Sequence, residues 1–475
     1  MTDFNKMKDV LKKQKEAHIK DGPLSISTRK DWIDRCISSL IKYQNDIAEA
    51  ISDDFGHRSK ESSLLSDVAG SITSLKLAKE NINKWARPEK RKVSPSILGF
   101  LGAKLRVEYQ PLGTVGVISP WNFPVTLTFG PLGSIFAAGN RAMIKPSEFT
   151  PKTSELMKKM FAEQFSEDEV AIFSGGPEVG EAFSSLPFDH LLFTGATSIA
   201  KHVMRAASEN LVPVTLELGG KSPVIVSKNS NFEVSVNRIM AGKTLNAGQI
   251  CLAPDYVFIP EEKKDSFVSQ SKKIVTKMYP KIKDNPDYTS VINERHYDRL
   301  KGYISEAKDK GIEVVEINPN NEDFNQQPNH KIPPTLIINP DEDLLVMKEE
   351  IFGPILPIKT YSNISETINY INSKDRPLGL YYFGQDKKEM DKILKNTTSG
   401  GVTINDVVFH VAQDNAPFGG VGPSGTGSYH GIEGFKNFSH AKTVYSQTKF
   451  DALIDIFRPP YGSKAKNALK MQIKP

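Results

Sequence analysis

The sequence predicts an α/β protein built on parallel sheets, because short apolar segments end in glycine turns that lead directly into helical segments. Two such strand–turn–helix units are AIFSGG at residues 171–176 and LLFTGA at residues 191–196. Parallel strands need a helical crossover, so repeated units of this kind favour a doubly wound sheet. A chain of 475 residues is too long for one ordinary core, and we expect two or three lobes.

Periodicity predicts the elements of the first lobe. Residues 26–85 carry apolar side chains at helical spacing with charges on the opposite side, which indicates successive helices. Residues 104–113 and 116–120 favour β-structure, and residues 153–165 favour a helix.

A second series of strands and helices begins near residue 222. The predicted strands are 222–226, 256–260, 334–338 and 355–361, and the predicted helices are 232–247 and 262–279. The Asn-rich, Pro-containing run at 317–334 indicates a surface loop within this second lobe.

Composition and charge exclude several classes of protein. The 61 Lys and Arg residues are dispersed among 56 Asp and Glu residues, giving a net charge of +5, so we expect a solvated surface and no nucleic-acid partner. The two cysteines exclude a disulfide scaffold and favour a reducing compartment, so we predict a cytoplasmic protein. Prolines interrupt the longest uncharged stretch, 109–140, and leave no segment that spans a bilayer of about 30 Å, so we expect no membrane partner.

Cys251 is a candidate nucleophile. It lies in the segment NAGQICLAPDY, and a cysteine used so sparingly in a Gly-Gln-flanked loop favours thiol chemistry. The residues alone fit an inert cysteine at a loop–strand junction equally well. Cys36, in the helical segment DRCISSLIKY, is expected to be a small buried apolar residue.

Glu217 and Asn122 are candidate partners for such a thiol. Glu217 lies in LELGGK between two leucines, where an apolar setting is expected to raise its pKa toward the range of a general base. Asn122 lies in SPWNFP and offers an amide donor. On the residues alone, Glu217 also fits a surface carboxylate at a strand end, and Asn122 also fits a turn. No GxGxxG dinucleotide fingerprint follows any predicted strand.

Seven motifs in a fixed order carry a resemblance to a known family. They are SPWNFP (119–124), KPSE (145–148), FTGATSIAK (193–201), LELGGK (216–221), GQICLAPDY (248–256), EEIFGP (349–354) and PFGGVGPSGTGSYHG (417–431). The series resembles the aldehyde dehydrogenase superfamily from about residue 21 to about residue 461. The ending SYHG indicates its class 3 branch, and the chain is most similar there to coniferyl aldehyde dehydrogenases.

The resemblance implies a role for each of the three candidates. Cys251 would add to the aldehyde carbon, giving a thiohemiacetal that releases hydride and leaves a thioester. Asn122 and the backbone N–H of Cys251 would stabilise the oxyanion, a contribution of about 3 kcal/mol for a donor of this kind. Glu217 would activate the water that hydrolyses the thioester. No metal site is expected.

The resemblance also implies an NAD site, with NADP as an alternative cofactor. Gly195, Ala196 and Thr197 would open a helix whose N-terminal amides face the pyrophosphate. The family commonly reads G-S/N-T-x-x-G here, and Ala196 in this chain leaves only backbone contacts.

Further cofactor contacts are implied by the other motifs. Lys145 and Glu148 would bind the adenosine ribose hydroxyls, and the Glu148 carboxylate would disfavour the 2′-phosphate of NADP. Glu350 and Phe352 would hold the nicotinamide ribose and pack the ring, and Trp121 is also assigned to cofactor binding. On the residues alone, Lys145 and Glu350 fit ordinary surface charges.

The implied architecture has a Rossmann-like cofactor domain, an α/β catalytic domain and a small β bridging element. We assign residues 1–90 and 116–215 to NAD(P) binding, 216–401 to catalysis, 91–115 and 402–450 to the bridge, and 451–475 to a solvated C-terminal tail. An arm of this kind adds strands across subunits, so a homodimer is expected.

The implied function is NAD(P)-dependent oxidation of a small-molecule aldehyde to the carboxylic acid. An aromatic aldehyde such as coniferaldehyde and a medium- or long-chain aliphatic aldehyde both remain open. Five aromatic residues are candidates for a bulky apolar pocket, although they also fit a plain core: Trp121, Phe123, Tyr381, Tyr382 and Phe409. The alternatives are a CoA-acylating aldehyde dehydrogenase, against which Glu217 argues, and a catalytically silent relative.

Overall fold

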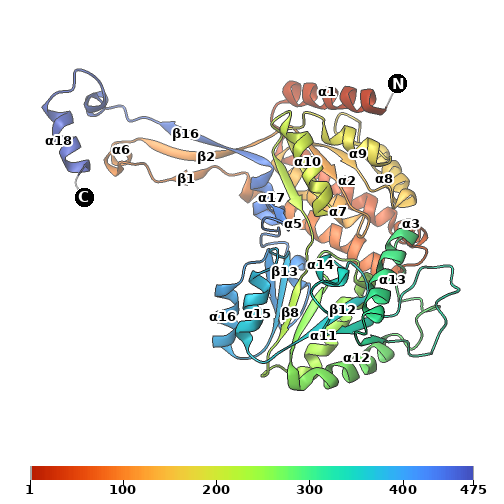
Figure 1. The fold of residues 1–475 in the computed structure, drawn as a ribbon. Helices are drawn as coiled ribbons and strands as arrows, with labels where there is room; N and C mark the ends of the chain where they lie inside the picture. The colour runs from red at the N-terminus through yellow and green to blue at the C-terminus, as the bar shows by residue number, and fades with distance from the viewer. Residues whose placement is uncertain (1–2, 474–475) are drawn as a thin grey trace.

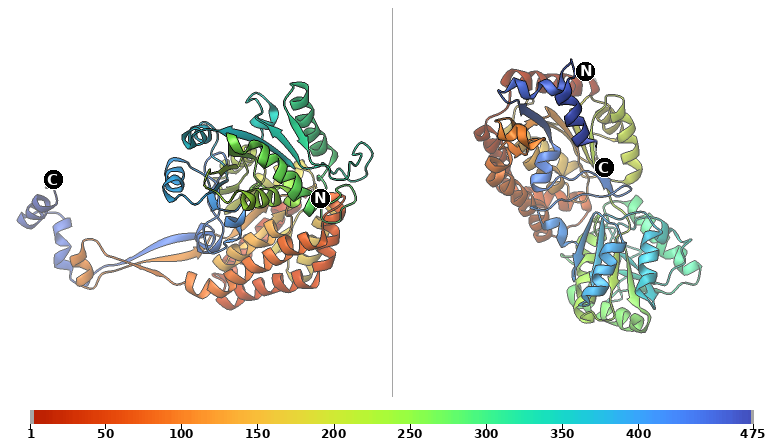
Figure 2. Two further views of the ribbon diagram at one scale, coloured as in Figure 1. Left: turned by 90° about the horizontal axis from the view of Figure 1, so that it is seen from below. Right: turned by 90° about the vertical axis from the view of Figure 1, so that its left-hand side faces the viewer.

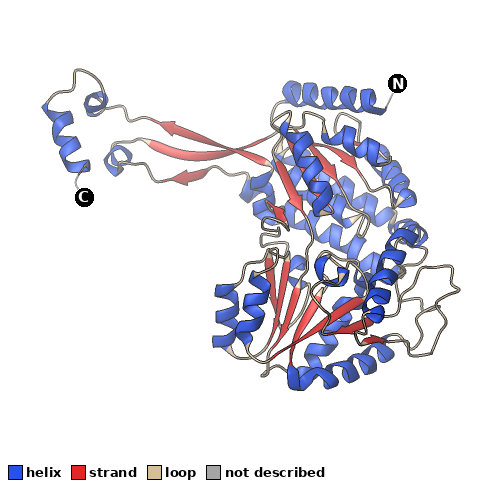
Figure 3. Ribbon diagram, viewed as in Figure 1, coloured by secondary structure: helices blue, strands red, loops and turns tan. Residues whose placement is uncertain are grey.

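The structure, a computed structural model that describes residues 3–473, consists of two α/β lobes and a long projecting arm (Figure 1). Each lobe has its own sheet, and helices cover both faces of these sheets (Figure 3). The predicted α/β fold class, with a Rossmann-like parallel sheet and a second α/β lobe, is confirmed.

The first lobe contains a six-stranded sheet in which five neighbouring strands are parallel. Its order is β15 (Gly425–Thr426), β7 (Val214–Glu217), β6 (His190–Thr194), β3 (Thr114–Ile118), β4 (Arg141–Lys145) and β5 (Val170–Ile172), with β15 antiparallel. The central strands are buried almost throughout, as in sheets with helices on both faces.

Helices cover this sheet in two groups. The helices of the lobe are α1 (Asp3–Asp21), α2 (Ile26–Lys42), α3 (Gln44–Phe55), α4 (Lys60–Ser63), the π-helix η1 (Leu64–Ala69), α5 (Gly70–Trp85), α7 (Thr126–Ala138), α8 (Pro151–Gln164), α9 (Pro177–Ser184) and α10 (Thr197–Ser208). One core joins α2, α5, α7 and α8 around Trp32 and the stacked rings of Phe129 and Phe161. A second core joins α1, α9 and α10 on the other face.

The second lobe contains a seven-stranded sheet that is parallel except at one edge. Its order is β10 (Val314–Glu316), β11 (Thr335–Ile338), β12 (Ile355–Tyr361), β9 (Tyr256–Pro260), β8 (Pro223–Val226), β13 (Gly379–Phe383) and β14 (Gly401–Ile404), with β10 antiparallel. Its helices are α11 (Phe232–Thr244), α12 (Lys264–Met278), α13 (Glu294–Asp309), α14 (Leu345–Lys348), α15 (Ile364–Asn372) and α16 (Lys387–Asn396), with short 3-10 turns at Leu245–Gly248, Glu261–Lys263 and Phe409–Ala412.

Local sequence explains where several of these helices begin and end. Asn231, Asn293 and Asp386 cap α11, α13 and α16 with side-chain oxygens that accept backbone N–H groups. The helix predicted at 232–247 ends at Thr244 instead, because the residues that follow adopt left-handed backbone conformations. The predicted loop at 317–334 is confirmed.

The arm is a three-stranded antiparallel ribbon that projects far from both lobes (Figure 2). Its elements are β1 (Glu89–Arg91), α6 (Ser96–Phe100), β2 (Lys104–Pro111), β16 (Ser439–Ser446), the 3-10 turns Asp451–Leu453 and Asp455–Phe457, and α18 (Ser463–Gln472). The helix α17 (Gly431–Asn437) leads into β16 and packs against α5 and α7 of the first lobe. β16 pairs with β2 along all eight of its residues, and its other edge is open in the part of the chain that is described.

The arm exposes large apolar side chains at its far end. Phe100 is 87% exposed, and the others are Ile97, Tyr445, Phe450, Phe457, Tyr461, Leu469 and Ile473. Within residues 3–473, none of the helices is both long and apolar enough to cross a lipid bilayer.

Candidate active site

Several site candidates lie where the parallel strands of the first lobe reach their carboxyl ends. β4 ends at Lys145 and β7 ends at Glu217, while residues 195–197 follow β6 and residues 119–124 follow β3. Carboxyl ends of parallel strands meet at one edge of a sheet, which is where α/β proteins bind their ligands. The fold therefore brings together motifs that are far apart in the sequence.

The loop that carries Cys251 is strained and buried. Asn246, Ala247 and Gly248 have φ values of 49°, 51° and 74°, so three consecutive residues are left-handed. A non-glycine residue in this region costs about 1–3 kcal/mol and persists only where its surroundings fix it. A Cβ at Gly248 would overlap the carbonyl of Gly353, so this loop packs directly against the EEIFGP segment of the second lobe.

Cys251 is half-buried, and its setting opposes ionisation of the thiol. Burial raises its pKa to about 12, and the negative charges of Glu350 and Glu217 act in the same direction. The backbone N–H groups of Cys251 and Leu252 lower the pKa. These backbone N–H groups therefore favour the thiolate, and in the protein alone desolvation outweighs them.

Glu217 ends β7 with its side chain almost fully buried, at 3% exposure. Neither of its carboxylate oxygens has a hydrogen-bond partner among the described residues. Burial raises its pKa well above the ordinary value, as the flanking leucines led us to expect. This carboxylate is thus poised to take up a proton.

Glu350 brings a second carboxylate to the site from the other lobe. A Cβ at Gly219 would overlap the Glu350 carboxylate, so the glycine of LELGGK allows this close approach. Burial and the charge of Asp255 raise the pKa of Glu350 to about 8, while a hydrogen bond from the backbone of Gly220 lowers it. Glu350 therefore lies beside the turn that follows Glu217.

Asn122 connects the two lobes. Its side chain is 4% exposed, and Nδ2 donates to the carbonyl of Gln249 at 3.1 Å. Gln249 stands two residues before Cys251, so the Asn122 amide is fixed beside the thiol loop. Because Nδ2 carries two hydrogens, the second is free to donate to another acceptor.

Residues 195–197 form a helix start that suits an anion. Ala196 is the N-cap of α10, and no side chain in the described part of the chain caps this terminus. The hydroxyl of Thr197 instead donates to the carbonyl of Pro423 at 3.1 Å. A Cβ at Gly195 would lie 2.7 Å from the Phe193 ring, which explains the glycine. The Gly195 N–H donates to the Glu217 carbonyl at 3.0 Å, and an uncapped helix start of this kind can bind an anion through its other N–H groups.

Lys145 and Glu148 form an ion pair at the end of β4. Lys145 Nζ lies 2.7 Å from Glu148 Oε2, and the lysine side chain is 5% exposed while the glutamate side chain is 33% exposed. The pair presents one buried cation and one accessible carboxylate, groups that can donate to and accept from ribose hydroxyls.

Trp121 and Phe352 lie against each other across the lobes. Their ring centroids are 5.3 Å apart in an edge-to-face arrangement, and Phe352 is left-handed with a φ of 47°. Trp121 also contacts Phe55 and His296. The prediction that both aromatics belong to one site is consistent with this contact.

Two of the pocket aromatics predicted from the sequence are core residues. Tyr381 and Tyr382 are fully buried in the cores of the second lobe, because β13 is an interior strand, paired with β8 on one side and β14 on the other. Tyr381 donates to the carbonyl of Leu252 at 2.5 Å and so braces the residue after Cys251. Phe409 is 62% exposed. Cys36 is fully buried, as expected, and burial raises the pKa of its thiol.

No sequence pattern singles out Arg58, Asp67 or Asn246. Each is buried and hydrogen bonded next to Asn122 or to its segment. Arg58 and Asp67 lie in a run of polar and charged residues that looks like a solvated face, and only their burial reveals them.

Comparisons with known proteins agree on one family. A family model described as "Aldehyde dehydrogenase family" matches residues 3–444. The chain is 60% identical over 469 residues to "Probable coniferyl aldehyde dehydrogenase" of Caulobacter vibrioides, covering 98% of this chain and 97% of that protein. It is 53% identical to "Coniferyl aldehyde dehydrogenase" of a Pseudomonas species, covering 97% and 95%.

A solved structure has the same fold. "Substrate bound state of Staphylococcus Aureus AldH" matches with a TM-score of 0.91 and 35% identity, covering 98% of this chain and 99% of that one. The resemblance inferred from the seven motifs is confirmed.

The buried, unpartnered Glu217 predicts a pH-dependent stability. Its folded-state pKa is raised, so the stability it contributes is full below the ordinary value of 4.5 and is lost as the pH rises through the raised pKa. Glu217→Gln should therefore stabilise the protein relative to wild type more at pH 8 than at pH 5. Between the ordinary and the raised pKa, every rise of one pH unit adds about 1.4 kcal/mol to that difference. Urea denaturation followed by tryptophan fluorescence measures it, and equal differences at both pH values would contradict the raised pKa.

Proposed function

Because this chain belongs to the aldehyde dehydrogenase family and is an oxidoreductase that acts on an aldehyde with a nicotinamide cofactor, we propose that it oxidises aromatic aldehydes such as coniferaldehyde, using Cys251 as nucleophile. One observation carries the assignment of the residues. The hydrogen bond from Asn122 Nδ2 to the Gln249 carbonyl fixes an amide donor beside the Cys251 loop.

The first step is addition of the thiolate to the carbonyl carbon. The sulfur of Cys251 forms a C–S bond, and the carbonyl π electrons move onto oxygen. The resulting oxyanion accepts hydrogen bonds from the second Asn122 Nδ2–H and from the backbone N–H of Cys251. A preorganised donor of this kind lowers the barrier by about 3–4 kcal/mol.

The tetrahedral adduct then collapses. The electron pair on oxygen re-forms the carbonyl, and the C–H bond electrons leave as hydride, so the aldehyde carbon is oxidised to a thioester on Cys251. The bound nicotinamide cofactor supplies the hydride acceptor.

Glu217 completes the cycle by acting on water. Its carboxylate accepts a proton from water, the hydroxide attacks the thioester carbon, and the C–S bond breaks to release the carboxylic acid and regenerate the thiolate. The raised pKa of Glu217 suits this role, because it makes the carboxylate a stronger acceptor of a proton from water.

The cofactor residues support NAD as the preferred cofactor. The uncapped start of α10 offers backbone amides to the pyrophosphate, and the aromatic pair Trp121 and Phe352 offers packing for the nicotinamide ring. Glu148 presents an accessible carboxylate beside Lys145, and this charge repels a 2′-phosphate.

An aromatic substrate is supported by the relatives and by the rings near the thiol loop. Both highly identical relatives carry the name coniferyl aldehyde dehydrogenase. Trp121 and Phe123 flank Asn122 and pack against the main core of the first lobe. Steady-state kinetics across coniferaldehyde, benzaldehyde, octanal and succinic semialdehyde test this, and the highest kcat/KM is expected for coniferaldehyde. A higher kcat/KM for octanal would contradict an aromatic preference.

We further propose a homodimer in the cytoplasm. β16 leaves an open strand edge on the projecting arm, and large apolar side chains such as Phe100 and Phe457 are exposed at its end. A second copy can satisfy the strand edge and bury these groups. Both cysteines are free thiols, which suits a reducing compartment.

Cys251→Ser should abolish NADH formation from every aldehyde, because a hydroxyl of much higher pKa does not form the adduct at neutral pH. The variant should still fold and bind NAD. Cys36→Ser is the control, since Cys36 is buried on α2 and is not among the candidate site residues, and this variant should retain nearly full turnover. Absorbance at 340 nm measures both, and equal losses would contradict the assignment of the nucleophile.

Glu217→Gln should separate the two half-reactions. Hydride transfer should still occur once, giving a rapid burst of NADH near one equivalent per site, followed by very slow turnover as the thioester accumulates. Stopped-flow absorbance and intact-protein mass detect the burst and the acyl adduct. If Glu217 also deprotonates Cys251, the burst is slowed and partly recovers at higher pH.

Coenzyme A serves as the control for that experiment. A Glu217→Gln enzyme with unchanged steady-state turnover would remove Glu217 from the mechanism, and stimulation of the wild type by CoA would support the CoA-acylating alternative.

Glu148→Gln should narrow the preference for NAD over NADP, because it removes the negative charge that faces the 2′-phosphate. The kcat/KM values for the two cofactors measure this preference before and after the change. A wild-type enzyme with a markedly higher kcat/KM for NADP would contradict the role of Glu148.

A further inference from the structure

A buried ion pair lies behind the proposed active site. Arg58 belongs to the loop between α3 and α4, and Asp67 belongs to the π-helix η1. Both side chains are completely buried, with Arg58 Nη2 2.9 Å from Asp67 Oδ2. Ser66 Oγ accepts a hydrogen bond from the same Nη2 at 2.9 Å and donates to Asp67 Oδ2 at 3.2 Å.

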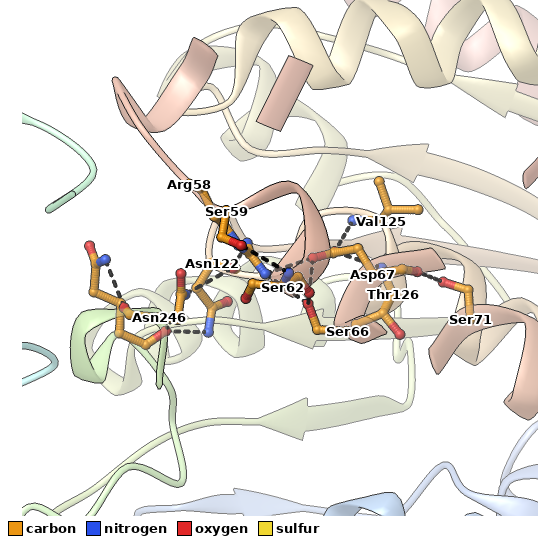
Figure 4. Close-up of polar contacts among 11 residues, drawn as sticks. Arg58, Ser59, Ser62, Ser66, Asp67, Ser71, Asn122, Val125, Thr126 and Asn246 are labelled. Atoms are coloured by element: carbon orange, nitrogen blue, oxygen red, sulfur yellow. Dashed lines mark hydrogen bonds and ion pairs between the residues drawn. The ribbon is translucent and has the colours of Figure 1, made fainter. Parts of the chain in front are cut away.

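The ion pair is hydrogen bonded to the Asn122 segment at two points (Figure 4). Arg58 Nη1 donates to the backbone carbonyl of Asn122 at 2.8 Å. Asp67 Oδ1 accepts the backbone N–H groups of Val125 and Thr126, at 3.0 and 3.2 Å, where α7 begins. Both ends of a five-residue stretch are therefore bonded to one buried pair of charges.

The same network continues into the thiol loop. Asn246 Nδ2 donates at 3.2 Å both to the Asn122 carbonyl and to the Gln249 carbonyl. The Gln249 side chain is fixed in turn by Ser290 and Ile292, at 2.9 and 3.0 Å. Arg58 and the Cys251 loop thus share one acceptor, the Asn122 carbonyl.

Filling this space with a buried ion pair costs free energy that apolar residues would not cost. A buried ion pair must overcome the desolvation of both charges, and apolar residues of similar volume are often as stable. The bidentate geometry of a guanidinium offers instead a fixed direction for each hydrogen bond. The pair therefore has a clear positional consequence, which is the placement of residues 122–126.

We infer that Arg58 and Asp67 are positioning residues that hold the Asn122 side-chain amide at the place where the oxyanion forms beside Cys251. The inference rests on the proposed function, because it assigns Asn122 as the oxyanion donor. Arg58 does not touch the reacting atoms and acts only through Asn122. Its removal should slow thiol addition and hydride transfer while leaving the Cys251 thiol and the cofactor site in place.

A double-mutant cycle between Arg58 and Asn122 tests the inference. Arg58→Lys keeps the positive charge but loses the planar fork, and it should lower the rate constant of the NADH burst by about tenfold or more. In an Asn122→Ala background the same change should lower it by less than about twofold, because the amide to be positioned is gone. The burst is normalised to the number of NAD-binding sites found by titration, because only folded protein binds the cofactor.

A matched control and two further variants complete the design. Arg141 is an equally buried arginine, paired with Asp21 and Asp168 at the opposite end of β4 from Lys145, and Arg141→Lys should leave the normalised burst within about twofold of wild type. Asp67→Asn and the milder Ser66→Ala should slow the burst in the wild-type background only. If Arg58→Lys does not fold, these two variants test the inference in its place. The Kd for NAD should stay within about twofold in every variant, because none of the changed side chains is among the proposed cofactor residues.

The possible results distinguish failure of this inference from failure of the proposed function. Equal fold-losses from Arg58→Lys, or from Asp67→Asn and Ser66→Ala, with and without the Asn122 amide would overturn this inference and leave the proposed function intact. Normalised burst rate constants that stay unchanged in all three variants would also overturn this inference and leave the proposed function intact. A wild-type enzyme that forms no NADH from any aldehyde would overturn the proposed function, and this inference with it.

Discussion

The hydrogen bond between the Asn122 amide and the Gln249 carbonyl is the contact on which the site depends. It joins the loop after β3 in the first lobe to the thiol loop that precedes β9 in the second. The two carboxylates near Cys251 also come from different lobes, Glu217 from the first and Glu350 from the second. No single lobe contains the whole constellation, so the docking of the two lobes assembles the chemistry.

That docking also explains why the backbone tolerates strain near the thiol. The left-handed residues Asn246 and Ala247 hold an unfavourable conformation that the chain does not adopt unaided. Hydrogen bonds from Asn246 and Gln249 in the loop, together with the close approach of Gly353, fix this conformation. The contacts made by the folded protein therefore hold the Cys251 loop in a conformation that an isolated peptide would not keep.

Local patterns in the sequence reveal much of this structure, and long-range packing accounts for what they miss. Strand–turn–helix units predict the two parallel sheets, and the apolar neighbours of Glu217 predict its raised pKa. Tyr381 and Tyr382 were candidates for a pocket, yet they are core residues. They lie on an interior strand that is buried on both faces, and the sequence does not distinguish a buried strand aromatic from one that lines a pocket. Arg58 and Asp67 resemble surface charges until the fold buries them against the Asn122 segment.

The electrostatics of the thiol indicate what the chain alone does not supply. Among the residues that the structure describes, the two charged groups that act on Cys251 are carboxylates that oppose ionisation, and only backbone N–H groups favour it. Protonation of Glu350, whose pKa is about 8, removes one of these charges at neutral pH. The remaining desolvation is what a positively charged nicotinamide ring near the sulfur would offset. On the proposed function, the thiol therefore stays protonated and unreactive until the cofactor binds, so the nucleophile is formed only when a hydride acceptor is in place.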